Sequence, residues 1–290
     1  MAYKLRAVET DGLLFSNSRG KAFDTNAVAL ALGAKHVASF AVSAGAITDH
    51  LPFLKYILSD QAAHGGKIQK VLLLLDADFF GTRPWTNLNL DSFLPPEVSG
   101  ESGLRFWLRY LFAVQFKGWR ESITSTARRD LTATPNVRLA SLDGPPTGLV
   151  AAGGQPAQAE EAPTPERLSR ISKSHKPFLN EQLRDLDEFV QLCRRKDIQL
   201  TIALNPLTRV NSSTYEPGRL EDTIASINEI TDLWDFTAPE WLAEDLAHWL
   251  DVSHFRPEIA QVMLDRMFAN AGPSDFGRFR RKAESGSLER

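Results

Sequence analysis

The sequence predicts an α/β protein, a three-layer α/β/α sandwich whose central sheet has about five parallel strands. Short apolar segments alternate along the chain with segments in which apolar residues recur at helical spacing. The apolar segment 71–75 is continuous, which is typical of a strand covered on both faces. The chain has 290 residues, of which 43% are hydrophobic and 24% charged. This length suffices for a large core, and we expect residues 1–290 to form a single domain.

The positions of the elements follow from this alternation. We expect strands at 12–15, 36–42, 71–75, 199–204 and 233–236. Helices are expected from Asp24 or Thr25 to Leu32, from Thr48 or Asp49 through Leu58, over 177–196, over 220–230, and onward from Pro257. The single cysteine, Cys193, has apolar neighbours at helical spacing, so we interpret it as a core residue of its helix rather than a nucleophile.

Two regions depart from the alternation. Residues 80–165 predict a helical, lid-like insertion over one end of the sheet, with an aromatic helix around 106–116. Core packing is the favoured role of these aromatic side chains, and the lining of a substrate cleft is the alternative. Within the insertion, residues 141–166 are rich in Gly, Pro, Ala and Glu and predict a flexible loop. Residues 271–290, which include a short basic run, predict a flexible tail.

The composition argues against several classes of partner. The net charge is -3, so there is no basic excess to neutralise the phosphates of a nucleic acid. No apolar run approaches the roughly 20 residues that span a bilayer. No apolar segment follows the early basic residues Lys4 and Arg6, so we expect no signal peptide and a soluble chain.

Polar residues that could carry chemistry follow the predicted strands. Ligands of open parallel sheets bind beyond the carboxyl ends of the strands. In chain order, these ends carry Ser18, Gly45, the pair Asp76 and Asp78, and Asn205. The segment Asp251-Val252-Ser253-His254 stands directly before the last predicted helix.

Ser18, His254 and Asp251 are the candidate catalytic residues. A serine hydroxyl becomes a good nucleophile when a base takes its proton and a third group orients that base. The spacing of Asp251 and His254 puts a carboxylate beside an imidazole, and Ser18 lies in a tight turn after a strand. The same Asp-x-x-His spacing occurs at Asp245 and His248, which we interpret as surface residues.

Other readings of these polar residues stay open. Arg19 can hold a substrate carboxylate or form a structural ion pair. Asp76, Asp78 and Asp251 could form an acidic metal site, but we favour an arrangement without metal or organic cofactor.

Three stretches carry a resemblance to a known family. Residues 13–19 (Leu-Leu-Phe-Ser-Asn-Ser-Arg) are similar to the first block of the SGNH, or GDSL-like, hydrolases, and residues 41–45 resemble the second. Residues 249–258 (Trp-Leu-Asp-Val-Ser-His-Phe-Arg-Pro-Glu) closely resemble the Asp-x-x-His block, including the proline that starts the last helix. The likeness covers both ends of the chain. It implies a flavodoxin-like sandwich.

The resemblance also implies an activity. It points to a serine esterase or O-acyltransferase that acts on a small-molecule or glycan ester, such as an acetylated polysaccharide of the cell envelope. Ser18, Asp251 and His254 would be catalytic, and the amides of Ser18 and Gly45 would bind the oxyanion. Relatives of this branch often stand behind a membrane anchor, so an envelope location is expected if such an anchor precedes this chain, and a cytoplasmic location is expected otherwise. The alternatives are an inactive descendant that binds a glycan or a protein partner, and a structural role in an export complex.

The sequence departs from the family pattern at two places. Ser16 stands where many members have glycine, and the usual Gly-x-Asn-Asp block, whose Asn donates to the oxyanion, is replaced by Asp76 or Asp78 at the corresponding strand end. Asn17 and Asn205 are the candidates to replace that donor.

Overall fold

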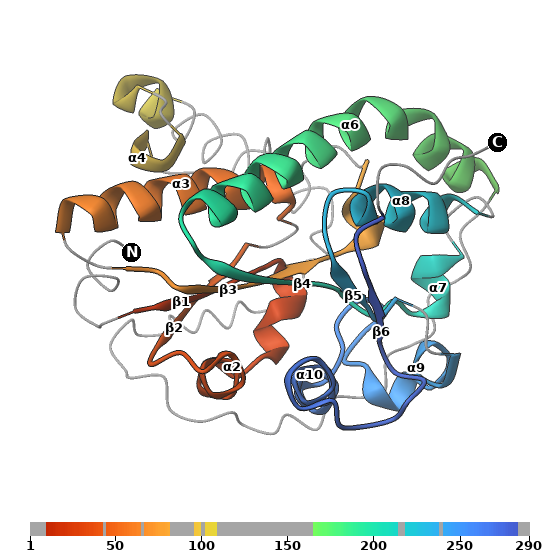
Figure 1. Cartoon of the computed structure of the whole chain (residues 1–290). Helices are drawn as coiled ribbons and strands as arrows, with labels where there is room; N and C mark the ends of the chain where they lie inside the picture. The colour runs from red at the N-terminus through yellow and green to blue at the C-terminus, as the bar shows by residue number, and fades with distance from the viewer. Residues whose placement is uncertain are drawn as a thin grey trace, which may run out of the picture.

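The computed structural model describes residues 10–42, 45–64, 67–81, 96–99, 102–108, 165–213, 218–237 and 240–283. In this part of the chain a six-stranded sheet has the strand order β2-β1-β3-β4-β5-β6 (Figure 1). The strands are β1 (Gly12–Ser16), β2 (Val37–Ala41), β3 (Lys70–Leu75), β4 (Gln199–Leu204), β5 (Leu233–Asp235) and β6 (Arg278–Arg280). Strands β1 to β5 are parallel and β6 runs antiparallel to β5.

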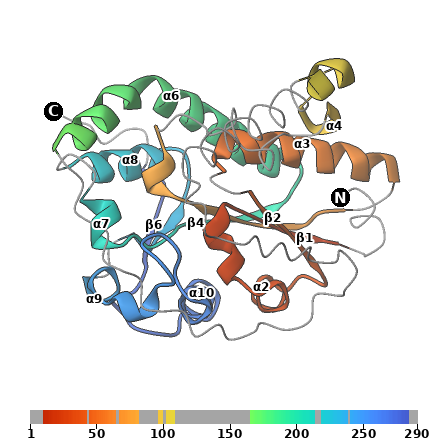
Figure 2. The ribbon, with the colours of Figure 1, turned by 180° about the vertical axis from the view of Figure 1, so that it is seen from behind.

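Helices cover both faces of the sheet. The α-helices are α2 (Thr25–Leu32), α3 (Ile47–His64), α4 (Pro96–Ser99), α6 (Pro165–Arg195), α7 (Arg209–Ser212), α8 (Arg219–Asn228), α9 (Glu240–Glu244) and α10 (Pro257–Leu264). Shorter turns are η1 (Ser18–Ala22), η2 (Ala77–Phe79), η4 (Leu246–His248) and η5 (Asp265–Ala269). Helices α3, α6 and α8 lie on one face, and α2, α9 and α10 lie on the other (Figures 1 and 2). The predicted α/β class and its layers are therefore confirmed.

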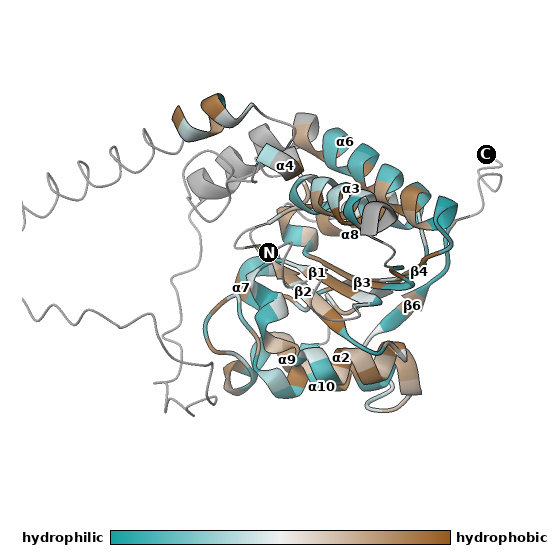
Figure 3. Ribbon diagram, turned by 90° about the vertical axis from the view of Figure 1, so that its left-hand side faces the viewer, coloured by the Kyte–Doolittle hydropathy of each residue, from teal (hydrophilic) through white to brown (hydrophobic). Residues whose placement is uncertain are grey.

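Two apolar cores explain why the strand segments are continuously apolar. Successive side chains of a strand point to opposite faces. Phe15 packs with Leu54 of α3 and Phe189 of α6 on one face. Leu14, the residue before it, packs with Val28 of α2 and Met263 of α10 on the other. Figure 3 shows the hydrophobic strands enclosed between helices that carry hydrophilic segments.

Helix ends follow the local chemistry of the sequence. The Asp24 carboxylate accepts hydrogen bonds from the Asn26 and Ala27 N–H groups at the start of α2, and Gly33 ends that helix with φ of 63°. Pro257 opens α10. Cys193 is buried in α6, as interpreted from the sequence, and burial raises the pKa of its thiol to about 12.

The C-terminal segment differs from the flexible tail predicted for 271–290. Residues 278–280 form β6 and extend the sheet beyond the predicted strands. Phe276 is fully buried against Phe236, with ring centroids 4.9 Å apart. Gly277 has φ of 80°, and a Cβ there would lie 2.2 Å from the Phe236 ring. Aromatic packing therefore fixes the first part of this segment onto the sheet.

Other predictions need smaller corrections. Helix α6 begins at Pro165, so it contains the last residues of the predicted 141–166 loop, and Pro177 lies inside the helix rather than at its start. Most of the insertion predicted for 80–165, and residues 141–164 of its loop, lie outside the described residues. No helix in the described ranges combines the length and apolar character that a membrane span requires.

Candidate active site

The predicted chemistry-bearing residues gather at the carboxyl edge of the sheet. Ser18 begins turn η1 directly after β1, Asp76 follows β3, and Asn205 follows β4. Because these strands are parallel and adjacent, their carboxyl ends meet at one edge. The segment from Asp251 to His254 reaches the same edge just before α10.

The turn that carries Ser18 is fixed by its neighbours. Asn17 caps the turn, because its Oδ1 accepts a hydrogen bond from the Arg19 N–H at 2.9 Å. Its backbone carbonyl accepts from the Gly20 N–H at 3.1 Å. These bonds fix the turn that carries the Ser18 hydroxyl. Ser18 itself is half-buried, so part of this residue is accessible from the surface.

Ser18, His254 and Asp251 form a hydrogen-bonded series. The Oγ of Ser18 lies 2.8 Å from Nε2 of His254, and Nδ1 of His254 lies 2.7 Å from Oδ2 of Asp251. In the tautomer that this arrangement favours, Nδ1–H donates to the carboxylate and Nε2 accepts from the serine hydroxyl. The three residues that the sequence analysis selected are thus within hydrogen-bond reach of one another.

The Asp251 carboxylate also shapes the loop that carries the histidine. Its Oδ1 accepts hydrogen bonds from the backbone N–H groups of Ser253 at 2.7 Å and His254 at 2.9 Å. Partial burial acts to raise the pKa of Asp251, but these hydrogen bonds and the His254 ring outweigh it and hold the pKa below its usual value. An ionised carboxylate is the form that orients an imidazole and stabilises its positive charge.

The second Asp-x-x-His pair has a different environment. His248 Nε2 lies 3.6 Å from Oδ2 of Asp245, and both side chains are largely exposed. The His248 ring packs edge-on against Trp241. No serine hydroxyl hydrogen-bonds this histidine in the described part of the chain, in agreement with its interpretation as a surface residue.

Arg19 and Asp78, both candidate residues of the oxyanion or substrate-binding region, form an internal ion pair. The two terminal nitrogens of Arg19 donate to the two oxygens of Asp78, each at 2.8 Å, and Nη1 also lies 2.8 Å from Oδ1 of Asp76. Arg19 is only 3% exposed. Each of the three guanidinium nitrogens therefore has a partner inside the protein, which supports the interpretation of this arginine as a structural ion pair.

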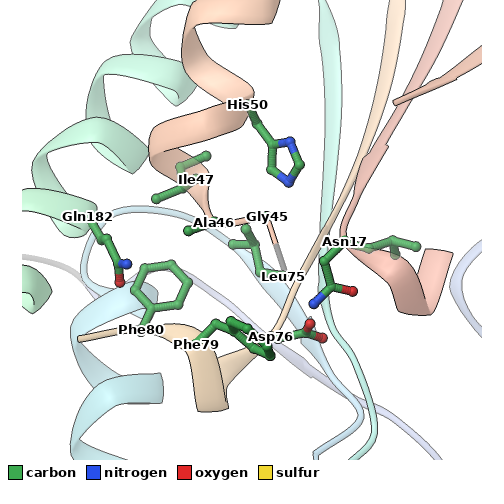
Figure 4. Close-up of a pocket in the computed structure, with 11 residues that line it drawn as sticks. Asn17, Gly45, Ala46, Ile47, His50, Leu75, Asp76, Phe79, Phe80 and Gln182 are labelled. Carbon is green, nitrogen blue, oxygen red and sulfur yellow. The ribbon is translucent and has the colours of Figure 1, made fainter. Parts of the chain in front are cut away.

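Two of the expected oxyanion donors, those of Gly45 and Asn205, are bonded to other groups. The Gly45 N–H donates to the Val42 carbonyl at 2.9 Å. Asn205 is fully buried, and its amide nitrogen donates to Oδ1 of Asp76 at 2.7 Å. The Asn17 oxygen caps η1, and its amide nitrogen points toward Asp76 (Figure 4). Among the predicted backbone donors, the Ser18 N–H has no acceptor in the described residues.

A small cavity lies beside Asn17, the residue that caps turn η1. Asn17, Gly45, Asp76 and His50 are among its lining residues (Figure 4). The cavity measures about 10 Å³, which is room for about one water molecule and not for an ester.

Two ionisable groups beside this cavity are fully buried. Burial lowers the pKa of His50 to about 3, so this histidine is neutral at physiological pH. Burial also raises the pKa of Asp76, while Arg19 acts in the opposite direction. In the described ranges, no three His, Cys, Asp or Glu side chains gather in a way that could hold a metal ion.

Two residues that the sequence did not indicate, Thr208 and Asn211, hold the loop of residues 251–254 from the side of α7. Thr208 Oγ1 and Asn211 Nδ2 donate to the Val252 carbonyl at 2.9 and 3.1 Å. Thr208 is also the cap of α7, since its hydroxyl accepts from the Asn211 N–H. A threonine before a short polar segment is a recognisable cap signal, but nothing in the sequence links it to Val252.

Comparisons with protein-family models, with curated proteins and with solved structures found no match to this chain.

Proposed function

We propose that this chain is a serine esterase or O-acyltransferase of the SGNH hydrolase-like type. The observation that carries the proposal is the hydrogen-bonded series of Ser18, His254 and Asp251 at the carboxyl edge of the sheet. The strand order β2-β1-β3-β4-β5 is the flavodoxin-like order and is compatible with the family, although this order also occurs in unrelated proteins.

In the proposed reaction, Ser18 Oγ attacks the carbonyl carbon of an ester while His254 Nε2 takes its proton. Asp251 stabilises the imidazolium that results. Collapse of the tetrahedral intermediate expels the alcohol, which receives the proton from His254, and leaves an acyl group on Ser18. Water then releases the acid, or an acceptor hydroxyl takes the acyl group. We propose the Ser18 N–H as the first oxyanion donor, since it stands at the start of a turn and is unbonded among the described residues.

The substrate class follows from the resemblance and from the site. We propose a small acyl ester of a glycan hydroxyl, with acetyl as the simplest case. The half-exposed position of Ser18 is compatible with a large alcohol portion that stays outside the protein.

A second candidate function is an inactive binding protein of the same type. The observation that favours it is the occupation of the Gly45 and Asn205 donors by other groups. An oxyanion hole with one donor would lose rate, because each donor contributes about 10²- to 10³-fold in the best-studied serine hydrolases.

Hydrolysis of p-nitrophenyl acetate, together with labelling by a fluorophosphonate, distinguishes the two functions. We expect wild type to turn over the ester and to be labelled, and Ser18→Ala and His254→Ala to lose both by at least about a hundredfold. His248→Ala is the matched control, because it removes the histidine of the second Asp-x-x-His pair. Equal rates in all four proteins, or no labelling of wild type, would favour the binding protein.

A further inference from the structure

We propose that Arg19 is a positioning residue that locks the loop carrying His254 onto the turn carrying Ser18. This inference rests on the proposed function for its kinetic consequences. Its structural part concerns the relative placement of two segments and can be tested without any activity.

The first step is the bond from Arg19 to the histidine loop. Nε of Arg19 donates to the backbone carbonyl of Ser253 at 2.8 Å, and Ser253 directly precedes His254. Arg19 directly follows Ser18 in turn η1. A single side chain thus joins the residue beside the nucleophile to the residue beside the base, and these two positions are far apart in the chain.

The second step is the rigidity of that side chain. The forked end of Arg19 is held by both oxygens of Asp78, and Nη1 also meets Asp76. Asp76 is in turn held by the Asn205 amide from the end of β4. The Arg19 Cζ lies 5.9 Å from the centre of the Phe79 ring. A planar guanidinium with this many fixed partners keeps its Nε–H in one direction, which a flexible ammonium does not do.

The third step concerns the other support of the loop. Thr208 and Asn211 hold the Val252 carbonyl from the α7 side. These bonds limit the movement of the loop, but they come from a segment that does not carry the nucleophile. Apart from the hydrogen bond between His254 and Ser18, the Arg19 side chain provides the direct link between the loop and the Ser18 turn among the described residues.

A positioning role for Arg19 and a merely structural ion pair predict different effects on the two hydrogen bonds of His254. The hydrogen bond between His254 and Asp251 lies within one loop and does not depend on Arg19. The hydrogen bond between His254 and Ser18 joins the two segments and does depend on it. Loss of the Arg19 guanidinium should therefore weaken the hydrogen bond between His254 and Ser18 and leave the one between His254 and Asp251 intact. Misplacement of a reacting group by about 1 Å can reduce a rate by about a hundredfold.

The test is Arg19→Lys, which keeps a positive charge beside Asp76 and Asp78. A lysine ammonium cannot form the two-nitrogen contact with Asp78 and also donate to the Ser253 carbonyl. Asp78→Asn is the second variant, should the first fail to fold. It weakens the contact between the Arg19 guanidinium and residue 78 and leaves the ion pair of Arg19 with Asp76 in place. Arg280→Lys is the matched control, because Arg280 also binds a carboxylate with two nitrogens, that of Asp235 at 2.8 and 2.7 Å, away from the triad.

Three measurements apply to each folded variant: kcat and KM for p-nitrophenyl acetate, the proton resonance of His254 Nδ1–H, and hydrogen exchange of the amides of residues 250–256. For Arg19→Lys we expect kcat to fall by about ten- to a hundredfold with KM changed by less than about twofold. The Nδ1–H resonance should persist, and amide exchange in 250–256 should accelerate. Arg280→Lys should leave all three unchanged.

The outcomes separate this inference from the proposed function. If wild type shows neither turnover nor labelling, the proposed function fails, and the exchange measurement alone decides whether Arg19 holds the loop. Unchanged exchange in 250–256 in the folded Arg19→Lys protein, or in Asp78→Asn in its place, would overturn the inference. In an active enzyme, an unchanged kcat in the same variant would overturn it as well.

Discussion

The side chain of Ser16 fills the space that a side chain at position 20 would need. A Cβ on Gly20 would lie 1.8 Å from Ser16 Oγ and 2.3 Å from Ser16 Cβ. Ser16 is fully buried at the end of β1, and Gly20 is buried in the turn that begins with Ser18. The serine at a position where the resemblance leads one to expect glycine is thus accommodated by a glycine in the neighbouring turn.

Gly20→Ala should therefore destabilise the protein and displace the Ser18 turn. Overpacking of a buried site costs about 1–3 kcal/mol, and we expect a loss in this range together with reduced fluorophosphonate labelling. Ser16→Gly alone should cost about 0.5–1 kcal/mol, as glycine does within a strand. The double variant should recover stability and labelling relative to Gly20→Ala. Urea unfolding of the four proteins gives the coupling energy, and strictly additive effects would contradict the steric explanation.

Asp251→Asn should reduce kcat by about a hundredfold or more, because an amide in place of the carboxylate favours the wrong tautomer of His254. The matched control is Asp245→Asn, which changes the other Asp-x-x-His pair at a carboxylate that likewise accepts a turn hydrogen bond, here from the Ala247 N–H. We expect this control to keep the wild-type rate. Similar losses in both variants would indicate a general effect on the fold instead of a role in the triad.

The free energy of unfolding should decrease as the pH is lowered below about 6.5, in part because of His50. The pKa of His50 is lowered to about 3 in the folded protein by burial, so between this value and the ordinary pKa the unfolded chain binds a proton that the folded chain does not. Each pH unit in this window contributes up to about 1.4 kcal/mol in favour of unfolding. His50→Gln should remove this contribution, which amounts to about 2 kcal/mol between pH 7 and pH 5.

Urea unfolding of wild type and His50→Gln at pH 7, 6 and 5 provides the test. The comparison of pH dependence cancels any constant cost of the substitution. His248→Gln is the control, since its side chain is 41% exposed. Parallel pH dependence of the wild-type and His50→Gln proteins would show that the buried histidine takes no part.

Phe276→Ala should destabilise the protein by about 3–5 kcal/mol, the usual cost of removing a buried aromatic ring. The ring packs against Phe236 and Trp241, with centroids 4.9 and 5.6 Å away. Arg281→Ala, at an exposed position after β6, is the control and should change stability by less than about 0.5 kcal/mol. Chemical unfolding measures both. A Phe276→Ala protein as stable as wild type would mean that this segment does not belong to the folded core.

The candidate triad was accessible to sequence reasoning because each member is marked locally. Ser18 follows a strongly apolar strand, and Asp251 and His254 precede the proline that opens a helix. The parallel topology then brings these ends together without further information. The sequence left the role of Arg19 open between a substrate contact and an ion pair, and it did not reveal the bonds that occupy the Gly45 and Asn205 donors. A buried carboxylate at position 76 recruits two of these side chains, and only the three-dimensional arrangement reveals that it lies within their reach.

The elements that escaped prediction have weak local signals. Strand β6 is three residues long and reads Arg-Phe-Arg, which carries no clear apolar pattern at the edge of a sheet. Helix α7 has only four residues. The amphipathic pattern predicts the start of helix α6 near Pro177, whereas the helix continues back to Pro165.

The ribosome adds the proposed nucleophile long before the proposed base. Ser18 follows β1, which lies inside the sheet, while His254 is added after β5 and is joined to the turn of Ser18 by a contact that spans 236 positions. A ribosome-bound chain that lacks its last segment therefore exposes the serine without its histidine. Reactivity of Ser18 toward a fluorophosphonate would thus report that β1 and the His254 loop have come together, and a nascent chain without His254 would be silent in that assay.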